Sequence, residues 1–347
     1  MSTRVLHIGQ SVAITDSFFN FIKRTIDTNE HVFLFSCEDK KHTVKTKTIC
    51  IEDNGLYFWL KSFYIETHKA NKIILHGLFS SKLVIVLFCF PWLLRKSYWF
   101  IWGGDLYRHE LSNRDLKWHI LEFVRSRVIR NIGYLVTYIE GDVDLARKWY
   151  DAKGIRMNCL MYPSNIYKEQ KGDCEGQLTA KKKIHIQVGN SADPSNNHIE
   201  AFRILENYKN DNIRIYTPLS YGDQDYAELI IRNGYERFGD AFFPLTKFMP
   251  IERYITFLTN IDIVVFNHNR QQAMGNTIAL LGLGKKIHMR SDVTPWSMFR
   301  SLGIKVYDIN DFNLQLIDPQ TRVNNQLRVK DFFSEEKLIN QLSHIFE

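Results

Sequence analysis

Residues 184–202, IHIQVGNSADPSNNHIEAF, carry the pattern that decides the fold. Ile184, Ile186 and Val188 alternate as in a strand, which runs into Gly189, a polar loop and a helical pattern from His198. A strand that ends at glycine before a helix offers an anion free backbone N–H groups and the positive end of a helix dipole. The loop also carries short polar side chains that suit a diphosphate and a sugar, namely Asn190, Ser191, Asp193, Ser195, Asn196 and Asn197. The plainer alternative is a strand–loop–helix unit whose Asp and Asn residues cap the helix.

The same alternation of strand and helix runs through both halves of the chain. In the first half we expect strands over 4–9, 31–36, 72–77, 98–105 and 134–138, and helices over 16–28, 56–68 and 115–130. In the second half we expect strands over 184–189, 213–219, 241–243, 262–267 and 286–290, with helices between them. Strands that alternate with helices form parallel sheets, which bind ligands at the carboxyl ends of their strands. The sequence therefore predicts an α/β fold of the GT-B type, with two Rossmann-like domains facing a cleft.

The composition of single segments predicts the domain boundary and the cellular compartment. The polar, charged segment 168–183 reads as a linker between a domain over 1–167 and one over 184–330, and we expect 331–347 to form a helix that packs back across it. The five cysteines are scattered and never form Cys-x-x-Cys, which is typical of a reducing compartment and argues against a zinc site. The N-terminus enters a strand with no signal peptide, so a cytoplasmic protein is expected.

The net charge of +7 is compatible with an anionic membrane, a phosphorylated substrate or nucleic acid. Nucleic acid is excluded as a partner because no recognition module is visible and the basic residues are spread out. The segment 82-KLVIVLFCFPWLLRKSYWFIW-102 points to lipid, although its apolar part is too short to span a bilayer. It reads either as a buried helix or as an interfacial helix that places Phe88, Phe90 and Trp92 among acyl chains and Arg95 and Lys96 on headgroups.

A second strand–loop–helix signal lies in 266-FNHNRQQAMGNTIALLGLGKK-286. Gln271 and Gln272 suit sugar hydroxyls or a base edge, and Gly275 allows close approach of a phosphate. The alternative is an ordinary helix capped by Asn276. Between the two loops, Pro218 and Tyr221 follow a strand, where we expect them to hold a pyrimidine.

Five segments resemble the bacterial 4-acetamido-4,6-dideoxy-D-galactose (Fuc4NAc) transferase family of enterobacterial common antigen synthesis. They are 75-LHGLF-79, 102-WGGDLY-107, 188-VGNSADPSNNHI-199, 254-YITFLTNIDIVVFNHNRQQAMGNT-277 and 295-PWSMF-299. The chain differs from the family pattern at Gly104 and Asn269. The resemblance implies a metal-independent GT-B enzyme, peripheral on the cytoplasmic face of the inner membrane. It further implies a dTDP-sugar donor and an undecaprenyl-diphosphate-linked glycan acceptor, in common antigen or O-antigen synthesis.

By resemblance, the donor site contains Asn190, Ser191, Asp193, Asn196, His198, Arg270, Gln271, Gln272, Gly275 and Thr277, and Asp105 and Tyr107 face it from the acceptor domain. Arg270 and two helix N-termini are expected to stabilise the leaving group without a metal. No cofactor is expected. The pair Asp223 and Asp225 resembles a metal-binding Asp-x-Asp motif but lies in a turn, so we discount it.

A general base must lie within reach of the acceptor hydroxyl if the reaction inverts configuration. Asp105 is the first choice because Gly103 and Gly104 expose it at a strand end, and His76 and Asp16 follow. The alternative is that Asp105 caps its turn, and in a retaining reaction it would position substrates. Two other functions stay open: a sugar-nucleotide epimerase of similar layout, and a non-catalytic scaffold of polysaccharide assembly.

Overall fold

The chain forms two compact units, described here from a computed structural model that covers residues 3–10, 12–36, 48–50, 55–111, 114–169 and 183–347. Unit 1 consists of Met1–Ile166 with Glu335–Glu347, and unit 2 of Tyr167–Ser334. Most of the predicted linker, residues 170–182, lies outside the described residues. The C-terminal residues belong to unit 1, where Lys72 Nζ donates a hydrogen bond of 2.9 Å to the carbonyl of Ile345.

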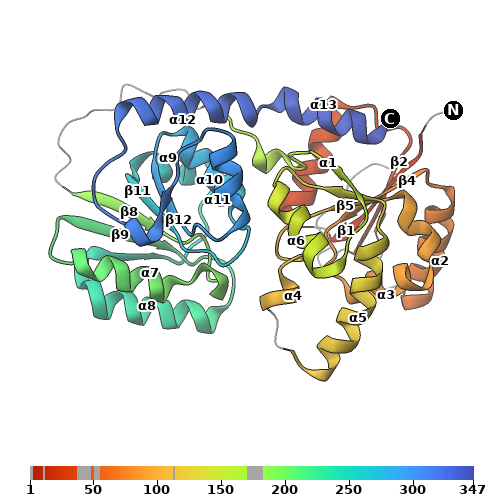
Figure 1. The fold of residues 1–347 in the computed structure, drawn as a ribbon, viewed down its shortest axis with the longest axis horizontal. Helices are drawn as coiled ribbons and strands as arrows, with labels where there is room; N and C mark the ends of the chain where they lie inside the picture. Colours follow the sequence, from red (N-terminus) through yellow and green to blue (C-terminus); the bar gives the residue numbers. More distant parts are fainter. Residues whose placement is uncertain (1–2, 11, 37–47, 51–54, 112–113, 170–182) are drawn as a thin grey trace. The chain divides into compact units, whose positions relative to one another are not determined.

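Unit 1 is built on a seven-stranded parallel sheet of order β3-β2-β1-β4-β5-β6-β7 (Figure 1). Its strands are β1 (Val5–Gln10), β2 (His31–Ser36), β3 (Thr48–Cys50), β4 (Lys72–His76), β5 (Ser97–Phe100), β6 (Tyr134–Val136) and β7 (Ile155–Met157). Its helices are α1 (Ala13–Thr25), α2 (Gly55–Lys69), α3 (Ser81–Cys89), α4 (Arg108–Leu111), α5 (Leu116–Asn131), α6 (Glu140–Tyr150) and α13 (Glu335–Phe346), with 3₁₀ turns η1 (Pro91–Lys96) and η2 (Pro163–Asn165).

Unit 2 is built on a six-stranded parallel sheet of order β10-β9-β8-β11-β12-β13. Its strands are β8 (Ile184–Val188), β9 (Ile213–Pro218), β10 (Phe242–Leu245), β11 (Ile263–Phe266), β12 (Lys286–Met289) and β13 (Tyr307–Asp308). Its helices are α7 (His198–Leu205), α8 (Gln224–Phe238), α9 (Ile251–Asn260), α10 (Met274–Gly282), α11 (Thr294–Ser301) and α12 (Pro319–Phe332), with 3₁₀ turns η3 (Pro194–Asn196), η4 (Glu206–Tyr208), η5 (Gly239–Ala241) and η6 (Ile309–Asp311).

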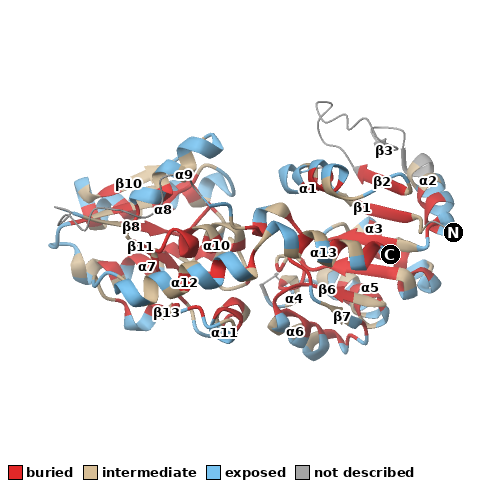
Figure 2. Ribbon diagram, turned by 90° about the horizontal axis from the view of Figure 1, so that it is seen from above, coloured by how far each residue is buried: buried red, intermediate tan, exposed pale blue. Residues whose placement is uncertain are grey.

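Buried residues follow the strands of both sheets, and exposed residues lie on the outer sides of the helices (Figure 2). Ile73, Ile74 and Leu75 in β4 are all fully buried, although consecutive residues of a strand point to opposite faces. A parallel sheet buries both faces under its crossover helices, which explains continuous apolar runs of this kind. The predicted α/β fold with parallel sheets is confirmed.

The apolar segment 82–102 does not form one helix. α3 ends at Cys89, and η1 begins at Pro91, where proline cannot continue the hydrogen bonding of the preceding helix. Leu83, Leu87 and Leu94 lie in the core, whereas Phe88 and Trp92 are exposed. The segment is therefore divided between core and surface, and the expectation of a single helix, whether buried or interfacial, is wrong.

Candidate donor site

The two polar loops singled out in the sequence leave neighbouring strands at one edge of the unit 2 sheet. β8 lies between β9 and β11, so the chain adds strands first on one side of β8 and then on the other. Such a switch point leaves a crevice at the carboxyl ends of the strands, where doubly wound folds bind ligands. The loop after β8 and the loop after β11 both start at this point.

The loop after β8 is held by a buried asparagine. Asn196 Oδ1 accepts hydrogen bonds from Asn190 N at 2.8 Å and from His268 Nε2 at 3.0 Å, and Asn196 Nδ2 donates to the carbonyl of Asp193 at 3.0 Å. Gly189 has φ +66°, and a Cβ there would collide with the imidazole of His198. His198 is itself fully buried, and burial lowers its pKa to about 3. Asn196 and His198 therefore shape the loop from behind.

An ion pair and amide contacts join the two loops. Arg270 Nη2 lies 3.3 Å from Asp193 Oδ2, Ser195 Oγ lies 2.6 Å from Gln272 Oε1, and Gln272 Nε2 donates to Asn190 Oδ1 at 3.3 Å. Burial alone would raise the pKa of Asp193, but hydrogen bonds from Ser195 and the charge of Arg270 lower it below its usual value. The Arg270 guanidinium has five N–H donors, so Asp193 and the carbonyl of Gln271 leave it capacity for an anion.

The helix after the second loop, α10, does not begin at Asn276, the residue that the alternative interpretation took as its N-cap. The N-cap of α10 is Ala273 in a left-handed conformation, and Asn276 is the third helical residue, so the interpretation of Asn276 as a cap is wrong. Thr277 is buried and donates to the carbonyl of Ala273 at 3.0 Å. Gly275 and Asn276 lie in the first turn of α10 and are partly exposed.

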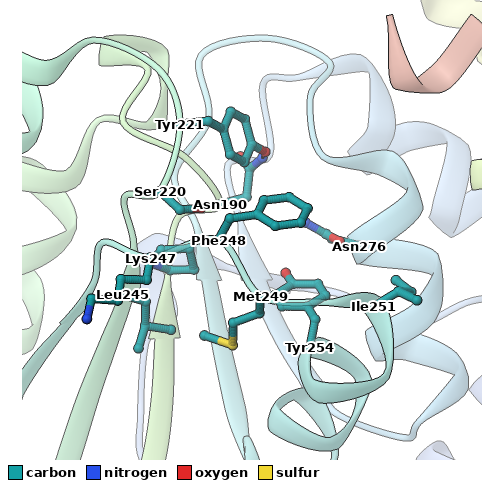
Figure 3. Close-up of a pocket in the computed structure, with 11 residues that line it drawn as sticks. Asn190, Ser220, Tyr221, Leu245, Lys247, Phe248, Met249, Ile251, Tyr254 and Asn276 are labelled. Carbon is teal, nitrogen blue, oxygen red and sulfur yellow. The ribbon is translucent and has the colours of Figure 1, made fainter. Parts of the chain in front are cut away.

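A cavity of about 220 Å³ opens beside these loops (Figure 3). Four residues named from the sequence line it: Asn190, Pro218, Tyr221 and Asn276. Asn190 Nδ2 donates to the Tyr221 hydroxyl at 2.8 Å, which ties the loop after β8 to the loop after β9. Pro218 and Tyr221, singled out as holders of a pyrimidine, therefore share one cavity with the first loop and with α10.

The other side of the cavity was missed by sequence reasoning. It consists of the end of β10, the segment between β10 and α9, and the start of α9. Its lining residues are Leu245, Lys247, Phe248, Met249, Ile251 and Tyr254. Phe248 is 82% exposed, and its ring points across the opening towards Asn276 in Figure 3. The sequence did contain a signal for this part of the cavity. Lys247 and Phe248 follow shortly after a strand, and the carboxyl end of that strand lies at the same sheet edge as the two polar loops.

The first-choice base in unit 1, Asp105, is enclosed by donors. Its carboxylate accepts hydrogen bonds from Leu78 N at 2.9 Å, Trp99 Nε1 at 2.7 Å, and Trp102 N and Leu106 N at 3.0 Å each. Asp105 is fully buried, and its carbonyl accepts from Arg125. This geometry favours the alternative role, in which Asp105 holds the turn that contains Gly103 and Gly104.

The second choice, His76, belongs to a buried chain of hydrogen bonds. Its Nδ1 lies 2.8 Å from the Tyr162 hydroxyl and its Nε2 lies 3.1 Å from His7 Nδ1, while His7 Nε2 lies 2.9 Å from His31 Nδ1. Burial lowers the pKa of His76 to about 3 and that of His31 to about 4. Both ring nitrogens of His76 are thus engaged, and the ring faces the core.

The remaining candidates in unit 1 lie in different surroundings. Tyr107 is buried and packs edge-on against Trp149, so it does not present its ring to a ligand. Asp16 lies in the first turn of α1, directly after β1, and is partly exposed. Of the three candidate bases, Asp16 is the one that is not fully buried, although its Oδ2 atom is shielded from solvent.

No group of three or more His, Cys, Asp or Glu side chains that could hold a metal occurs among the described residues. Asp223, from the discounted Asp-x-Asp pair, accepts a hydrogen bond from Tyr226 N at 2.9 Å and caps α8.

Solved glycosyltransferase structures share this architecture. HepE of Anabaena, in complex with UDP and glucose, is similar with a TM-score of 0.69 and 13% identity over 99% of this chain and 98% of that chain. WaaG, a glycosyltransferase involved in lipopolysaccharide biosynthesis, has a TM-score of 0.61 and 10% identity over 99% and 98%. An E. coli trehalose-6-phosphate structure bound with UDP-2-fluoro glucose has a TM-score of 0.63 and 10% identity over 99% of each chain. At such identities the likeness shows the fold alone, and it confirms the predicted GT-B class.

A match to a protein-family model identifies the family as well as the fold. The model described as "4-alpha-L-fucosyltransferase glycosyl transferase group 56" matches residues 23–330, which is most of the chain. It confirms the family suspected from the sequence motifs. This protein therefore belongs to glycosyl transferase group 56 and has the GT-B fold of the glycosyltransferases that it resembles.

Proposed function

We propose that the enzyme transfers a 4-acetamido-4,6-dideoxyhexose, similar to Fuc4NAc, from a dTDP-sugar to an undecaprenyl-diphosphate-linked oligosaccharide. The observation that carries the donor half of this proposal is the cavity beside the switch point of unit 2. The cavity is largely apolar and lies beside two polar loops, the second of which carries Arg270. An apolar chamber beside polar loops and a cation suits a nucleoside diphosphate.

In this proposal the base occupies the cavity. Rings of Tyr221, Phe248 and Tyr254 surround a space large enough for a planar ring, and the amides of Asn190 and Asn276 lie at its edge. Leu245 and Met249 add an apolar wall, which favours thymine because its 5-methyl group gains from leaving water. Neutral amides and apolar walls thus support dTDP as the nucleotide.

The diphosphate then lies beside Arg270 and the first turn of α10. The leaving group acquires negative charge as the sugar departs, and a fixed guanidinium and helix N–H groups stabilise that charge without rearrangement. Gly275 leaves room for a phosphate next to the backbone of this turn. These residues supply the role that a bound divalent ion has in metal-dependent transferases.

We assign the general base to Asp16. It lies in the first turn of α1, after β1 at the carboxyl edge of the unit 1 sheet, and is partly exposed, whereas Asp105 and His76 are buried. The lipid-linked acceptor would place the enzyme as a peripheral protein on the cytoplasmic face of the inner membrane. No helix among the described residues is long and apolar enough to cross a bilayer.

The reaction is tested by following a radiolabelled sugar from the dTDP donor. We expect the label to move to a lipid-extractable product when the undecaprenyl-linked acceptor is present, and most of the rate to persist in excess EDTA. An epimerase would leave the label on the nucleotide, and a scaffold would bind no donor. Either outcome contradicts the proposal, and a loss of rate restored by Mg²⁺ or Mn²⁺ contradicts its metal-independent part.

Replacing Asp16 by Asn is expected to lower kcat by about a hundredfold or more while the Kd for dTDP stays unchanged, because the variant loses only proton transfer. Kinetics and calorimetry on one preparation check this. Asp105→Asn is the matched comparison: an amide N–H would face backbone and indole donors, so we expect a lower Tm for that variant. An unchanged kcat in Asp16→Asn would exclude Asp16 as the base.

A further inference from the structure

Four helical segments of unit 1 present apolar side chains to solvent. The outer side of α5 carries Leu116, Ile120 and Phe123, which are 78%, 61% and 55% exposed and recur at a spacing of one helical turn. The exposed apolar residues of the other segments are Leu60, Tyr64 and Ile65 in α2, Ile85 and Phe88 in α3, and Trp92 in η1. Soluble monomers seldom expose apolar groups on this scale without a partner.

These segments form one continuous face, which we call the α2–α3–α5 face. α3 packs along α5, and a cavity of about 360 Å³ between them is lined by Phe88, Leu94, Phe123 and Arg127 among others. The ring of His68 in α2 lies 6.4 Å from that of Trp92 in η1, which joins α2 to the same surface. The helices also follow one another in chain order after β3, β4 and β5, and right-handed crossovers in that direction put them on one side of the sheet.

The charge on this face has one sign. The segments α2, α3, η1 and α5 contain nine lysines and arginines but only two acidic residues, Glu66 and Glu122. Both acids are buried and paired: Glu66 lies 2.5 Å from Arg4, and Glu122 lies 2.8 Å from His109. No carboxylate is exposed among the described side chains of these segments. Of the nine cations, Arg125 is buried and Arg130 lies 2.9 Å from Asp151.

The basic side chains flank the apolar ones. Lys82 lies in the first turn of α3, one turn before Ile85, and Lys117 follows Leu116. Arg127 extends the stripe of α5 by one turn, with its guanidinium 5.0 Å from the centre of the Phe123 ring. Lys96, by contrast, is not available, because its Nζ donates to the carbonyls of Thr67 at 2.8 Å and Ala70 at 2.6 Å. The sequence-based choice of Lys96 as a headgroup ligand is thus wrong, and α5 supplies basic groups that the sequence reasoning did not consider.

We propose that the α2–α3–α5 face docks unit 1 on an anionic lipid surface. Aromatic and aliphatic side chains on a helix surface enter the acyl boundary, while long basic side chains reach phosphates beside it. A protein partner that covered the face would have to pair its many cations with carboxylates, whereas an anionic bilayer supplies phosphates at any position. The inference rests on the proposed function in one respect: a lipid-linked acceptor explains why a bilayer should lie at this surface.

The test is flotation of the full chain with vesicles of phosphatidylcholine that contain about 30% phosphatidylglycerol, an anionic fraction typical of charged membrane surfaces. We expect binding to these vesicles and little binding to phosphatidylcholine alone. The double variant Ile120→Glu/Phe123→Glu should reduce the bound fraction about tenfold or more. Leu327→Glu is the matched control, because Leu327 is 64% exposed on α12 of unit 2, and its variant should float as the parent does.

A second measurement distinguishes insertion of side chains into the bilayer from electrostatic attraction to its surface. Trp92 is exposed on the proposed face, so its fluorescence should be quenched by brominated lipids, and Trp92→Phe should remove most of that quenching. Salt should weaken binding without abolishing it, since the apolar contribution is not screened. Equal flotation of the parent and Ile120→Glu/Phe123→Glu, binding that requires an added membrane protein, or equal binding to neutral vesicles would each overturn the proposal.

The flotation result can be interpreted separately from nucleotide binding at the donor site. Circular dichroism and the Kd for dTDP show whether Ile120→Glu/Phe123→Glu is folded, and we expect both to match the parent. If flotation is lost while transfer to a soluble acceptor analogue persists, the docking face is supported and the transferase function stands. If flotation follows the prediction but no dTDP binds, the docking face is supported and the proposed function is wrong.

Discussion

Arg270→Ala is expected to weaken dTDP binding about 30-fold, which corresponds to about 2 kcal/mol for a charge-assisted contact with a phosphate. The reason is that Arg270 is the cation held between the two loops, with donors beyond those used by Asp193 and Gln271. Calorimetry with dTDP measures the effect. The fold should persist, because Arg270 lies in a surface loop and not in the core.

Asp193 supplies the control for this experiment. In Arg270→Ala the Asp193 carboxylate loses its partner and would repel the diphosphate, so a weaker affinity by itself does not show that Arg270 touches phosphate. In Arg270→Ala/Asp193→Asn that repulsion is removed. We expect the double variant to stay weak; recovery of the parent affinity would mean that Arg270 acts only by neutralising Asp193.

The second large effect is acid unfolding of unit 1. Burial lowers the pKa of His76 to about 3 and of His31 to about 4, and burial together with the neighbouring histidines lowers that of His7 well below its usual value. The unfolded chain takes up these protons near pH 6.5, whereas the folded chain does not, so stability is full above pH 6.5 and falls as the pH drops towards 4. At pH 5 His76 and His31 each cost about 2 kcal/mol, and His7 adds to this loss, which is a large share of the stability of an ordinary domain.

Tryptophan fluorescence during urea unfolding at several pH values measures this loss in unit 1. Six of the seven tryptophans lie there, at positions 59, 92, 99, 102, 118 and 149. His76→Gln should reduce the dependence of the unfolding free energy on pH by about 1.4 kcal/mol per pH unit between pH 4 and 6.5, because one uptake site is gone. His119→Gln, at an exposed position on α5, is the control. The same pH dependence in the parent and in His76→Gln would show that the buried chain does not set it.

Local sequence signals predicted the elements well where the pattern was long and regular. The strand over 31–36 and the helix over 115–130 were found within one residue, because apolar periodicity and the Asp115 N-cap are both local properties. β3, β7 and β13 were missed, since they are two to three residues long and lie at the edges of their sheets. Pro91 also divided a segment that apolar content alone suggested was one helix.

The sequence by itself determined the parallel α/β class, the family, and the two polar loops around Asn190 and Gln271, because strand periodicity, glycine positions and motif spacing are written in consecutive residues. Tertiary structure alone decided which candidates line the cavity and which are buried behind the loops, as with His198, or engaged by donors, as with Asp105. It also decided that Phe248 and Tyr254 share a cavity with Asn190, and that α5 shares a face with Trp92. The physical reason is that burial and hydrogen-bond saturation depend on groups brought together from distant parts of the chain, which no local pattern records.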